Sequence, residues 1–290
     1  MTVPLTAEGL MVAKPFLKWV GGKRALLPVL LAHVPETFTA YHETFLGGGA
    51  LFFALASAGR LSGIPVTLSD VNADLITTYT VVRDDPEALI ASLEVHAKAH
   101  TKDAKATYYA IRSLHTLTDP VAIAARIIYL NRTCFNGLYR VNRRGEFNVP
   151  LGRRSSQHEA NDATPDIVRA EVILGAHRAL QGVSLRCQTF GDCTPSPGDF
   201  VYCDPPYDPL TATADFTAYA KHGFGPSDQA ALCTWAIKQR DSGVKLLLSN
   251  ADTPRVRDWY AGWQIDAIAA PRFVSARASS RQSVGEVVIG

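Results

Sequence analysis

Four consecutive residues, Asp204, Pro205, Pro206 and Tyr207, directly follow the apolar run 200–203 and combine the groups needed to handle a planar amine. The lone pair of an exocyclic base amine is delocalised into the ring, which makes the nitrogen a poor nucleophile. Two acceptors held at the amine hydrogens favour localising that lone pair. The Asp204 carboxylate can supply one and the Pro205 carbonyl the other, because a proline pair fixes φ and carries no competing amide donors. Tyr207 offers a flat face for a base, and such stacking is worth roughly 1 to 3 kcal/mol. The tetrapeptide is therefore the candidate catalytic site for direct methyl transfer to a base amine.

A glycine turn, Gly47-Gly48-Gly49, is the second candidate site, and it lies between a predicted strand over 41–45 and a predicted helix over 50–58. Glycines at such a turn let the backbone approach a ligand closely. An acid about 20 residues further on can accept hydrogen bonds from ribose hydroxyls. Asp70 stands at this spacing, at the end of a predicted strand over 66–70. The pattern indicates a nucleoside cofactor, although glycine turns between strand and helix also occur without one.

The two candidate sites belong to an alternation of strands and helices that predicts an α/β fold with a Rossmann-like doubly wound sheet. The alternation stops between residues 74 and 130, where the pattern is helical, with one helix opened by Pro86 and others over 104–117 and 120–130. A β-hairpin is predicted over 139–149, around a turn at Asn142-Arg143-Arg144-Gly145.

The alternation then resumes towards the C-terminus. Helices are predicted over 165–180, 227–240 and 254–260, and strands over 185–190, 199–203, 245–249, 264–269 and 286–289. We therefore expect a discontinuous catalytic domain, residues 1–73 and 160–290, interrupted by a helical and hairpin insert over 74–159.

Composition predicts a globular protein of the cytoplasm. Hydrophobic residues make up 47% and charged residues 19% of the chain, which is an ordinary globular balance. No apolar run approaches the roughly 18 residues of a membrane span, and the N-terminus lacks the pattern of a signal peptide. The five cysteines lack C-x-x-C pairs and zinc-ligand spacing, which indicates reduced thiols and no metal site. Cys203 could suggest the nucleophile of C5-cytosine methylation, but its place at the end of an apolar strand favours a buried thiol. No obligate protein partner is evident, so a monomer is expected.

Positive charge is concentrated in one segment, although the net charge of the whole chain is only +2. Between residues 126 and 154 there are seven arginines and one acid, namely Arg126, Arg132, Arg140, Arg143, Arg144, Arg153 and Arg154, with Glu146. Such a segment carries a local positive field, which attracts a polyanion.

Six stretches of the chain, in this order, resemble the Dam family of DNA adenine N6-methyltransferases. They are Pro15 to Lys23 (PFLKWVGGK), Phe45 to Gly49 (FLGGG), Ser69 to Asn72 (SDVN), Tyr129 to Arg132 (YLNR), Gly145 to Pro150 (GEFNVP) and Tyr202 to Tyr207 (YCDPPY). Their order, with the glycine turn first, an insert second and Asp-Pro-Pro-Tyr last, is similar to that of the α group of amino-methyltransferases. The resemblance implies transfer of a methyl group from S-adenosyl-L-methionine to a flipped adenine of double-stranded DNA, with GATC as the expected target.

The resemblance also implies which residues bind the cofactor. Trp19 and Lys23 resemble residues that contact it, Asp70 resembles the acid at its ribose, and Asp204 resembles the catalytic carboxylate. Phe190-Gly191-Asp192 occupies the place of the motif that holds the adenine of the cofactor. The full set of expected cofactor-binding residues is Trp19, Lys23, Phe45, Gly47, Gly49, Asp70, Phe190, Gly191, Asp192 and Asp204.

The insert of the family binds DNA, and its roles carry over onto matching residues. Phe135 and Asn136 align with a wedge that enters the duplex where adenine has left, since an aromatic ring can stack in the gap and an amide can bond the orphaned thymine. Lys18, Leu138 and Arg140 match positions that read bases. The arginines expected at phosphates are Arg132, Arg143, Arg144, Arg153 and Arg154. Arg154 stands where enterobacterial members have an aromatic residue. Outside the insert, residues 211–225 resemble a mobile segment beside the flipped base, and Arg272, Arg277 and Arg281 are expected to add phosphate contacts.

Three other functions fit the same tetrapeptide, because it recognises an amine rather than a polymer. They are N4-cytosine methylation of DNA, adenine methylation of RNA, and DNA binding by a catalytically silent regulator built on this fold. The family-like insert favours duplex DNA. Asp204 and Trp19 favour an enzyme, since a protein that only binds DNA need not retain them.

Overall fold

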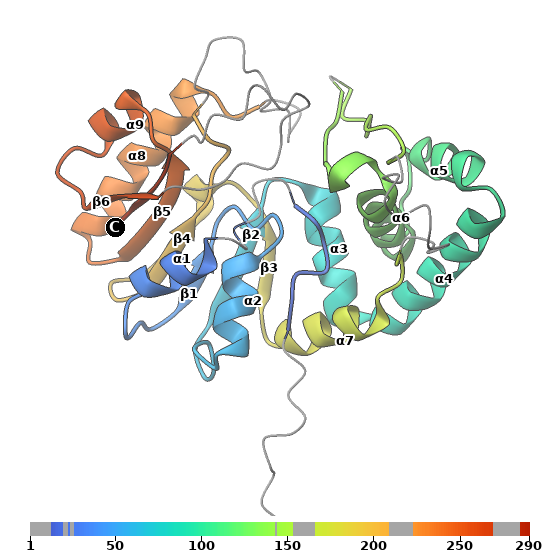
Figure 1. Cartoon of the computed structure of the whole chain (residues 1–290). Helices are drawn as coiled ribbons and strands as arrows, with labels where there is room; N and C mark the ends of the chain where they lie inside the picture. The colour runs from blue at the N-terminus through green and yellow to red at the C-terminus, as the bar shows by residue number, and fades with distance from the viewer. Residues whose placement is uncertain are drawn as a thin grey trace, which may run out of the picture.

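The computed structural model describes residues 13–19, 23, 26–142, 144–152, 166–208, 223–268 and 285–290. A seven-stranded sheet of order β3-β2-β1-β4-β5-β7-β6 lies at its centre (Figure 1). In chain order the strands are Tyr41–Glu43 (β1), Val66–Asp70 (β2), Ser184–Cys187 (β3), Phe200–Cys203 (β4), Lys245–Ala251 (β5), Ile265–Ile268 (β6) and Glu286–Ile289 (β7). Strand β7 runs antiparallel to both of its neighbours, and the other neighbouring pairs are parallel. The predicted α/β fold is confirmed, as a mixed sheet.

The central strands β1 and β4 bring the two candidate motifs side by side. β4 is buried at all of its residues, as is usual for a parallel strand covered on both faces. Its register with β1 runs from Tyr41↔Phe200 to Glu43↔Tyr202, so both strands end at the same edge of the sheet. Because β2 pairs with the other side of β1, the strand order reverses between β1 and β4. Open α/β sheets bind ligands at such a reversal, beyond the carboxyl ends of the strands.

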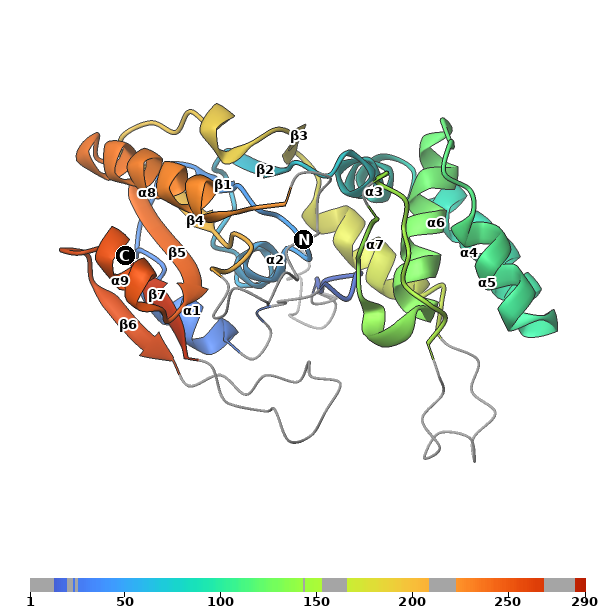
Figure 2. The ribbon, with the colours of Figure 1, turned by 90° about the horizontal axis from the view of Figure 1, so that it is seen from above.

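Helices cover both faces of the sheet. α8 (Pro226–Asp241) and α9 (Pro254–Trp259) lie on one face, and α1 (Leu27–His33) and α2 (Ala50–Ser57) lie on the other (Figure 2). α8 and α9 each begin with a proline, whose missing N–H is not needed in the first turn of a helix. α1 was not predicted from the sequence, because its seven residues are too few to show a helical period. Among the helices that the structure describes, none is both long and apolar enough to cross a lipid bilayer.

The segment predicted as an insert is mainly helical and lies beyond the β3 edge of the sheet (Figures 1 and 2). Its helices are α3 (Ala73–Asp84), α4 (Pro86–Lys102), α5 (Ala104–Arg112) and α6 (Pro120–Thr133). Each of these helices is capped by the residue before it, whose side chain accepts a hydrogen bond from a backbone N–H of the first turn. The capping residues are Asn72, Asp85, Asp103 and Asp119, respectively. α3 contacts both β3 and α6, and α7 (Ala170–Ala179) contacts α2, α3 and α4.

One hydrophobic core runs from the sheet into this helical segment without a break. It includes Leu51 and Phe53 of α2, Tyr79 of α3, and Tyr129 and Leu130 of α6, all at most 1% exposed. A second core lies under α8 and α9 on the other face of the sheet. The division into domains at residues 73 and 160 stays a prediction, and its two parts share the first core.

Several elements differ in extent from the sequence prediction, and three of them show why. α5 ends at Arg112 rather than at residue 117. α7 begins at Ala170 rather than at residue 165, because Arg169 has a φ of 45°, which a helix interior does not allow. β3 ends at Cys187, and Phe190 instead begins a short 3-10 helix, η3 (Phe190–Asp192), which has its own capping box.

The predicted hairpin is present in reduced form. Asn142 organises its turn, because the side-chain Oδ1 accepts hydrogen bonds from the backbone N–H groups of Arg144 at 2.9 Å and Glu146 at 3.0 Å. Between the flanking segments, Val141↔Phe147 is an isolated antiparallel bridge rather than part of a ladder. The turn chemistry was therefore predictable, and the length of the strands was not.

Candidate active site

Lys23 lies against both ends of the tetrapeptide that follows β4. Its ammonium Nζ is 2.8 Å from Asp204 Oδ1 and 4.6 Å from the centroid of the Tyr207 ring. The side chain of Lys23 is 6% exposed and that of Asp204 is 20% exposed, so the ion pair is largely withdrawn from water. A predicted cofactor residue of the N-terminal segment and the predicted catalytic carboxylate are thus in direct contact.

The surroundings of Asp204 set its protonation state. Burial raises the pKa of Asp204 to about 6, because a low-dielectric environment disfavours the carboxylate. The Lys23 ammonium opposes this rise in pKa, and the charge of Glu286 on β7 adds to it. The Tyr207 hydroxyl donates a hydrogen bond to Glu286 Oε2 at 2.8 Å. At neutral pH Asp204 is mainly ionised, and an ionised carboxylate can only accept hydrogen bonds.

The glycine turn after β1 is shaped by Asp70 at the end of β2. The Gly47 N–H donates to Asp70 Oδ2 at 3.1 Å, and the Asn72 N–H donates to Oδ1 at 3.0 Å. Gly47 and Gly49 have φ values of 46° and 63°, in the left-handed region that favours glycine. The Tyr79 hydroxyl donates to the Gly47 carbonyl at 3.1 Å. Asp70 therefore fixes the turn itself, a contact that the sequence pattern did not predict.

Trp19 joins the glycine turn to the helical segment. A Cβ added at Gly47 would lie 2.7 Å from Trp19 Cδ1, so the indole packs directly on the turn. The same indole stacks on Tyr139, with ring centroids 5.0 Å apart and planes at 24°. Asn131 of α6 holds the adjoining residue in place, because its side chain bonds the backbone N–H and carbonyl of Lys18 at 2.8 Å and 2.6 Å.

The motif Phe190-Gly191-Asp192 lies beside Phe45, two residues after the end of β1. The Phe190 ring stacks on Phe45 with centroids 5.9 Å apart and planes at 25°, and Phe224 and Trp235 meet this pair edge-on. The exposed Asp192 carboxylate accepts hydrogen bonds from the Thr189 hydroxyl and N–H at 2.6 Å and 3.0 Å. These bonds hold the pKa of Asp192 below its ordinary value. The motif thus presents aromatic rings beside a capped acid.

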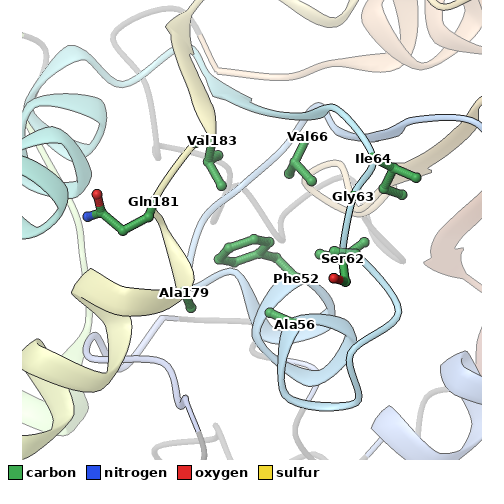
Figure 3. Close-up of a pocket in the computed structure, with 11 residues that line it drawn as sticks. Phe52, Ala56, Ser62, Gly63, Ile64, Val66, Ala179, Gln181 and Val183 are labelled. Atoms are coloured by element: carbon green, nitrogen blue, oxygen red, sulfur yellow. The ribbon is translucent and has the colours of Figure 1, made fainter.

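A cavity of about 270 Å³ lies at the opposite end of the strands (Figure 3). Its walls include Phe52 and Ala56 of α2, Val66 and Val183. Val66 begins β2 and Val183 directly precedes β3, so the cavity lies at the amino ends of the strands. The tetrapeptide and the glycine turn follow the carboxyl ends, and this cavity is therefore separate from the candidate site.

Phe135 and Asn136, the predicted wedge residues, lie next to each other at the surface of a tight turn. Phe135 is 42% exposed and begins the 3-10 turn Phe135–Gly137 (η2) directly after α6. Its N–H donates to the Pro150 carbonyl at 2.9 Å. Asn136 is exposed and has a φ of 56°, a left-handed conformation that few residues other than glycine adopt.

The other predicted DNA contacts are more varied in their surroundings. Lys18, Arg140 and Arg144 are exposed, and Leu138 is half-buried. Arg140 Nε donates to Asn148 Oδ1 at 2.7 Å, which holds the guanidinium across the hairpin. Arg132 is half-buried and donates from Nε to the Asp166 carbonyl at 3.0 Å. Arg143, Arg153, Arg154, residues 209–222 of the predicted mobile segment, and Arg272, Arg277 and Arg281 lie outside the described residues.

Arg126 does not contribute to the positive surface that the arginine count predicted. Its side chain is buried, and it donates from Nε to the Ile111 carbonyl at 3.1 Å and from Nη2 to the Arg112 carbonyl at 2.9 Å. These carbonyls end α5, where the last carbonyls of a helix lack partners of their own. For this arginine the prediction is wrong, because its guanidinium completes a helix end.

Three buried polar residues near the tetrapeptide were not predicted from the sequence. Glu43 ends β1 and accepts a hydrogen bond from the Tyr41 hydroxyl at 2.7 Å, and burial raises its pKa to about 8. Gln229 of α8 donates from Nε2 to the Pro206 carbonyl at 2.7 Å, and Asn250 of β5 donates from Nδ2 to Gln229 Oε1 at 3.0 Å. Glu43 and Asn250 had a usable signal, a polar residue near the carboxyl end of an apolar strand. Gln229 had none.

Comparisons with known proteins match nearly the whole chain to DNA methyltransferases. The family model described as D12 class N6 adenine-specific DNA methyltransferase matches residues 19–272. The type II methyltransferase M1.LlaDCHI of Lactococcus lactis subsp. cremoris is 38% identical, over 95% of this chain and 94% of the relative. The type II methyltransferase M.MjaIII of Methanocaldococcus jannaschii is 34% identical, over 94% and 96%. The DNA adenine methylase of Escherichia coli (strain K12) is 33% identical, over 95% and 94%.

Replacing Gly47 by alanine is expected to destabilise the protein more than the same change at Gly59. Both glycines have positive φ, 46° and 70°, so alanine adds backbone strain of about 1 to 2 kcal/mol at each. Only at Gly47 does the new Cβ meet a side chain, whereas nothing lies within 4 Å at Gly59. Chemical denaturation should show an extra loss of about 1 to 3 kcal/mol in the free energy of unfolding for Gly47→Ala. Equal losses for the two variants would contradict the close packing of Trp19 on the turn.

Proposed function

The chain belongs to the family of D12 class N6 adenine-specific DNA methyltransferases, and from this premise we propose that it methylates a flipped adenine within GATC, with S-adenosyl-L-methionine as the methyl donor. The observation that carries the proposed mechanism is the contact of Lys23 with Asp204, beside the glycine turn and beyond the carboxyl ends of β1 and β4. The target GATC rests on the resemblance of the six motifs to the Dam family.

We assign the orientation of the adenine amine to Asp204 and Pro205. The Asp204 carboxylate accepts a hydrogen bond from one amine hydrogen, and the Pro205 carbonyl accepts one from the other. These two bonds favour a lone pair that is localised on the nitrogen and directed at the methyl group. The Tyr207 ring stacks on the flipped base. Its ring is held by the Lys23 ammonium and by its hydroxyl bond to Glu286. Transfer is then direct and in line, and the enzyme contributes mainly by positioning.

The residues around the glycine turn fit S-adenosyl-L-methionine, which supplies an electrophilic sulfonium methyl when bound. Phe45 and Phe190 offer aromatic faces for its adenine. Gly47 carries no Cβ, which lets the indole of Trp19, a predicted cofactor residue, pack directly on the turn. Each Asp70 oxygen accepts one backbone N–H, and a carboxylate has about four acceptor sites. Asp70 therefore retains acceptors for the ribose hydroxyls.

We assign duplex binding to the helical segment and its hairpin. Extruding a base costs a few kcal/mol of unstacking and unpairing. Phe135 would offset part of this cost by stacking in the vacated space, with Asn136 beside it for the orphaned thymine. Lys18, Leu138 and Arg140 are the proposed base contacts, and Arg132, Arg143, Arg144, Arg153 and Arg154 are the proposed phosphate contacts.

Incubation with labelled S-adenosyl-L-methionine and with duplexes that contain or lack GATC tests the proposed function. We expect N6-methyladenine only in the GATC duplex. Asp204→Ala should lower kcat by at least about a hundredfold, because one of the two amine acceptors is lost, while DNA affinity in a gel-shift assay stays near that of the wild type.

Four outcomes would contradict parts of this proposal. N4-methylcytosine as the product, methylation of RNA in place of DNA, or absence of product in every duplex would refute the assigned reaction. Equal N6-methylation of duplexes with and without GATC would refute the target alone.

The rate of methylation should rise with pH through about 6 and then level off. Asp204 accepts the amine hydrogen only when ionised, and its pKa is about 6. Lys23→Met removes the cation that favours the carboxylate, so the midpoint of the pH profile should move upward, by about 1 to 3 pH units. Measuring kcat at saturating DNA and cofactor separates this shift from changes in binding. A midpoint that stays at the wild-type pH would contradict the assigned role of the ion pair.

Phe135→Ala should impair extrusion of the target base more than Tyr109→Ala. Both rings are exposed in the helical segment, at 42% and 38%, but only Phe135 is aligned with the wedge. With 2-aminopurine at the target position, we expect the fluorescence increase on binding to fall severalfold for Phe135→Ala and to persist for Tyr109→Ala. An undiminished increase in the Phe135 variant would remove this residue from the wedge.

A further inference from the structure

We propose that Gln229 and Asn250 position the catalytic tetrapeptide by holding the Pro206 carbonyl in a fixed place. We call these two hydrogen-bonded side chains the amide relay. Both are positioning residues, because they act through Pro206 rather than on the substrate. The proposal rests on the proposed function in one respect, the role given to Asp204 and Pro205.

The relay is a continuous chain of hydrogen bonds between elements distant in sequence. Gln229 Nε2 donates to the Pro206 carbonyl at 2.7 Å, and Asn250 Nδ2 donates to Gln229 Oε1 at 3.0 Å. Asn250 Oδ1 in turn accepts the N–H of Asp208 at 3.2 Å and that of Ala251 at 2.9 Å. Gln229 and Asn250 are each 1% exposed, so water does not compete for these bonds. The relay therefore begins and ends on the backbone of the same loop, at Pro206 and at Asp208.

The orientation of both amides is dictated by the two ends of the relay. The Pro206 carbonyl can only accept a hydrogen bond, so Gln229 must present its NH₂ group there and its oxygen to Asn250. The backbone N–H groups of Asp208 and Ala251 can only donate, so Asn250 must present its oxygen to them and its NH₂ group to Gln229. The two requirements agree at the bond between the side chains. The two amides thus satisfy the Pro206 carbonyl and both backbone N–H groups at once.

The far end of the relay is anchored to the scaffold through Asp208. The Asp208 carboxylate accepts hydrogen bonds from Arg255 Nη2 at 2.6 Å and from Nε at 3.2 Å, and from the Thr253 hydroxyl at 3.1 Å. Thr253 also caps α9, because its hydroxyl accepts the Val256 N–H at 3.1 Å. The loop is thus fastened to α8, β5 and the start of α9, on the side of the sheet away from α1 and α2 (Figure 2).

The carbonyls of Pro205 and Pro206 differ in their hydrogen bonding. The Pro206 carbonyl is engaged by Gln229, whereas within the described part of the chain no donor to the Pro205 carbonyl is found. Lys23 holds the Asp204 end of the loop and the relay holds the Pro206 end. A displacement of about 1 Å at a reacting group can cost a hundredfold in rate, so loss of the relay should appear in kcat rather than in binding.

The test uses Gln229→Met and Asn250→Leu, singly and together, with Gln239→Met as a matched control on the same helix. Gln239 is half-exposed and lies outside the relay. Hydrogen exchange of the Tyr207 and Asp208 amides reports on the loop without substrate, and we expect it to be at least about fivefold faster in both single variants. We expect kcat to fall about 10- to 100-fold, with the KM for DNA and the Kd for S-adenosyl-L-methionine within about twofold of wild type. The double variant should be no slower than the worse single variant, because the two residues act as one unit.

The outcomes that overturn the relay are distinct from those that refute the proposed function. Wild-type exchange in the Gln229 and Asn250 variants, an equal loss in Gln239→Met, or a double variant whose losses multiply would each overturn it. Faster exchange with an unchanged kcat would overturn the positioning role, because the relay would then hold the loop without affecting the reaction. A wild-type protein that methylates no adenine but shows relay-dependent exchange would refute the proposed function alone. The midpoint of thermal unfolding, measured for each variant, serves as the control for an intact fold.

Discussion

The in-register parallel pairing of β1 with β4 is the constraint on which the rest of the site depends. Adjacent strands lie about 4.8 Å apart, so the loops that follow them must be neighbours. The strands come from residues 41–43 and 200–203, and the intervening chain has to be closed into a loop. The entropy cost of closure grows only with the logarithm of loop length, about 0.6 kcal/mol for each doubling. A long intervening segment can therefore be accommodated without moving the glycine turn away from the tetrapeptide.

A second constraint is the balance of charge beneath the site. Glu43 and Asp204 are buried carboxyls whose pKa values are raised to about 8 and about 6, so at neutral pH the first is mainly protonated and the second mainly ionised. The charge of Asp204 raises the pKa of Glu43, although less than burial does, and Lys23 favours the ionised form of Asp204. A buried carboxylate without a cation would be costly. Of these two carboxyls only Asp204 is then mainly charged, and Lys23 forms an ion pair with it.

Much of the fold and part of the site were predictable from the sequence, for physical reasons that differ between residues. Elements with a clear pattern, such as the apolar run of β4 and the helical period of α6, appear where expected. Residue chemistry pointed to Asp204 and the glycine turn, and the Dam-like motifs added Lys23. The resemblance also singled out Phe135 and Asn136, which are both exposed, and their role at DNA stays a prediction. Arg126 was misassigned because its charge shows in the sequence and its burial does not. Gln229 was missed because a glutamine inside a helix has no distinguishing pattern until β5 packs beside it.

The core that runs unbroken from α2 through α3 into α6 limits how the helical segment, to which we assign duplex binding, can be exchanged between relatives. A segment with its own core can be exchanged between relatives as a unit. Here Trp19 stacks on Tyr139, and the Asn131 side chain bonds the backbone of Lys18, so residues 13–19 pack against the segment predicted as an insert. Chimeras that graft residues 74–159 from a relative would need matching partners from residues 13–19. On the DNA-binding role proposed for this segment, new sequence specificity would be more accessible through surface substitutions at the η2 turn and the hairpin than through exchange of the whole segment.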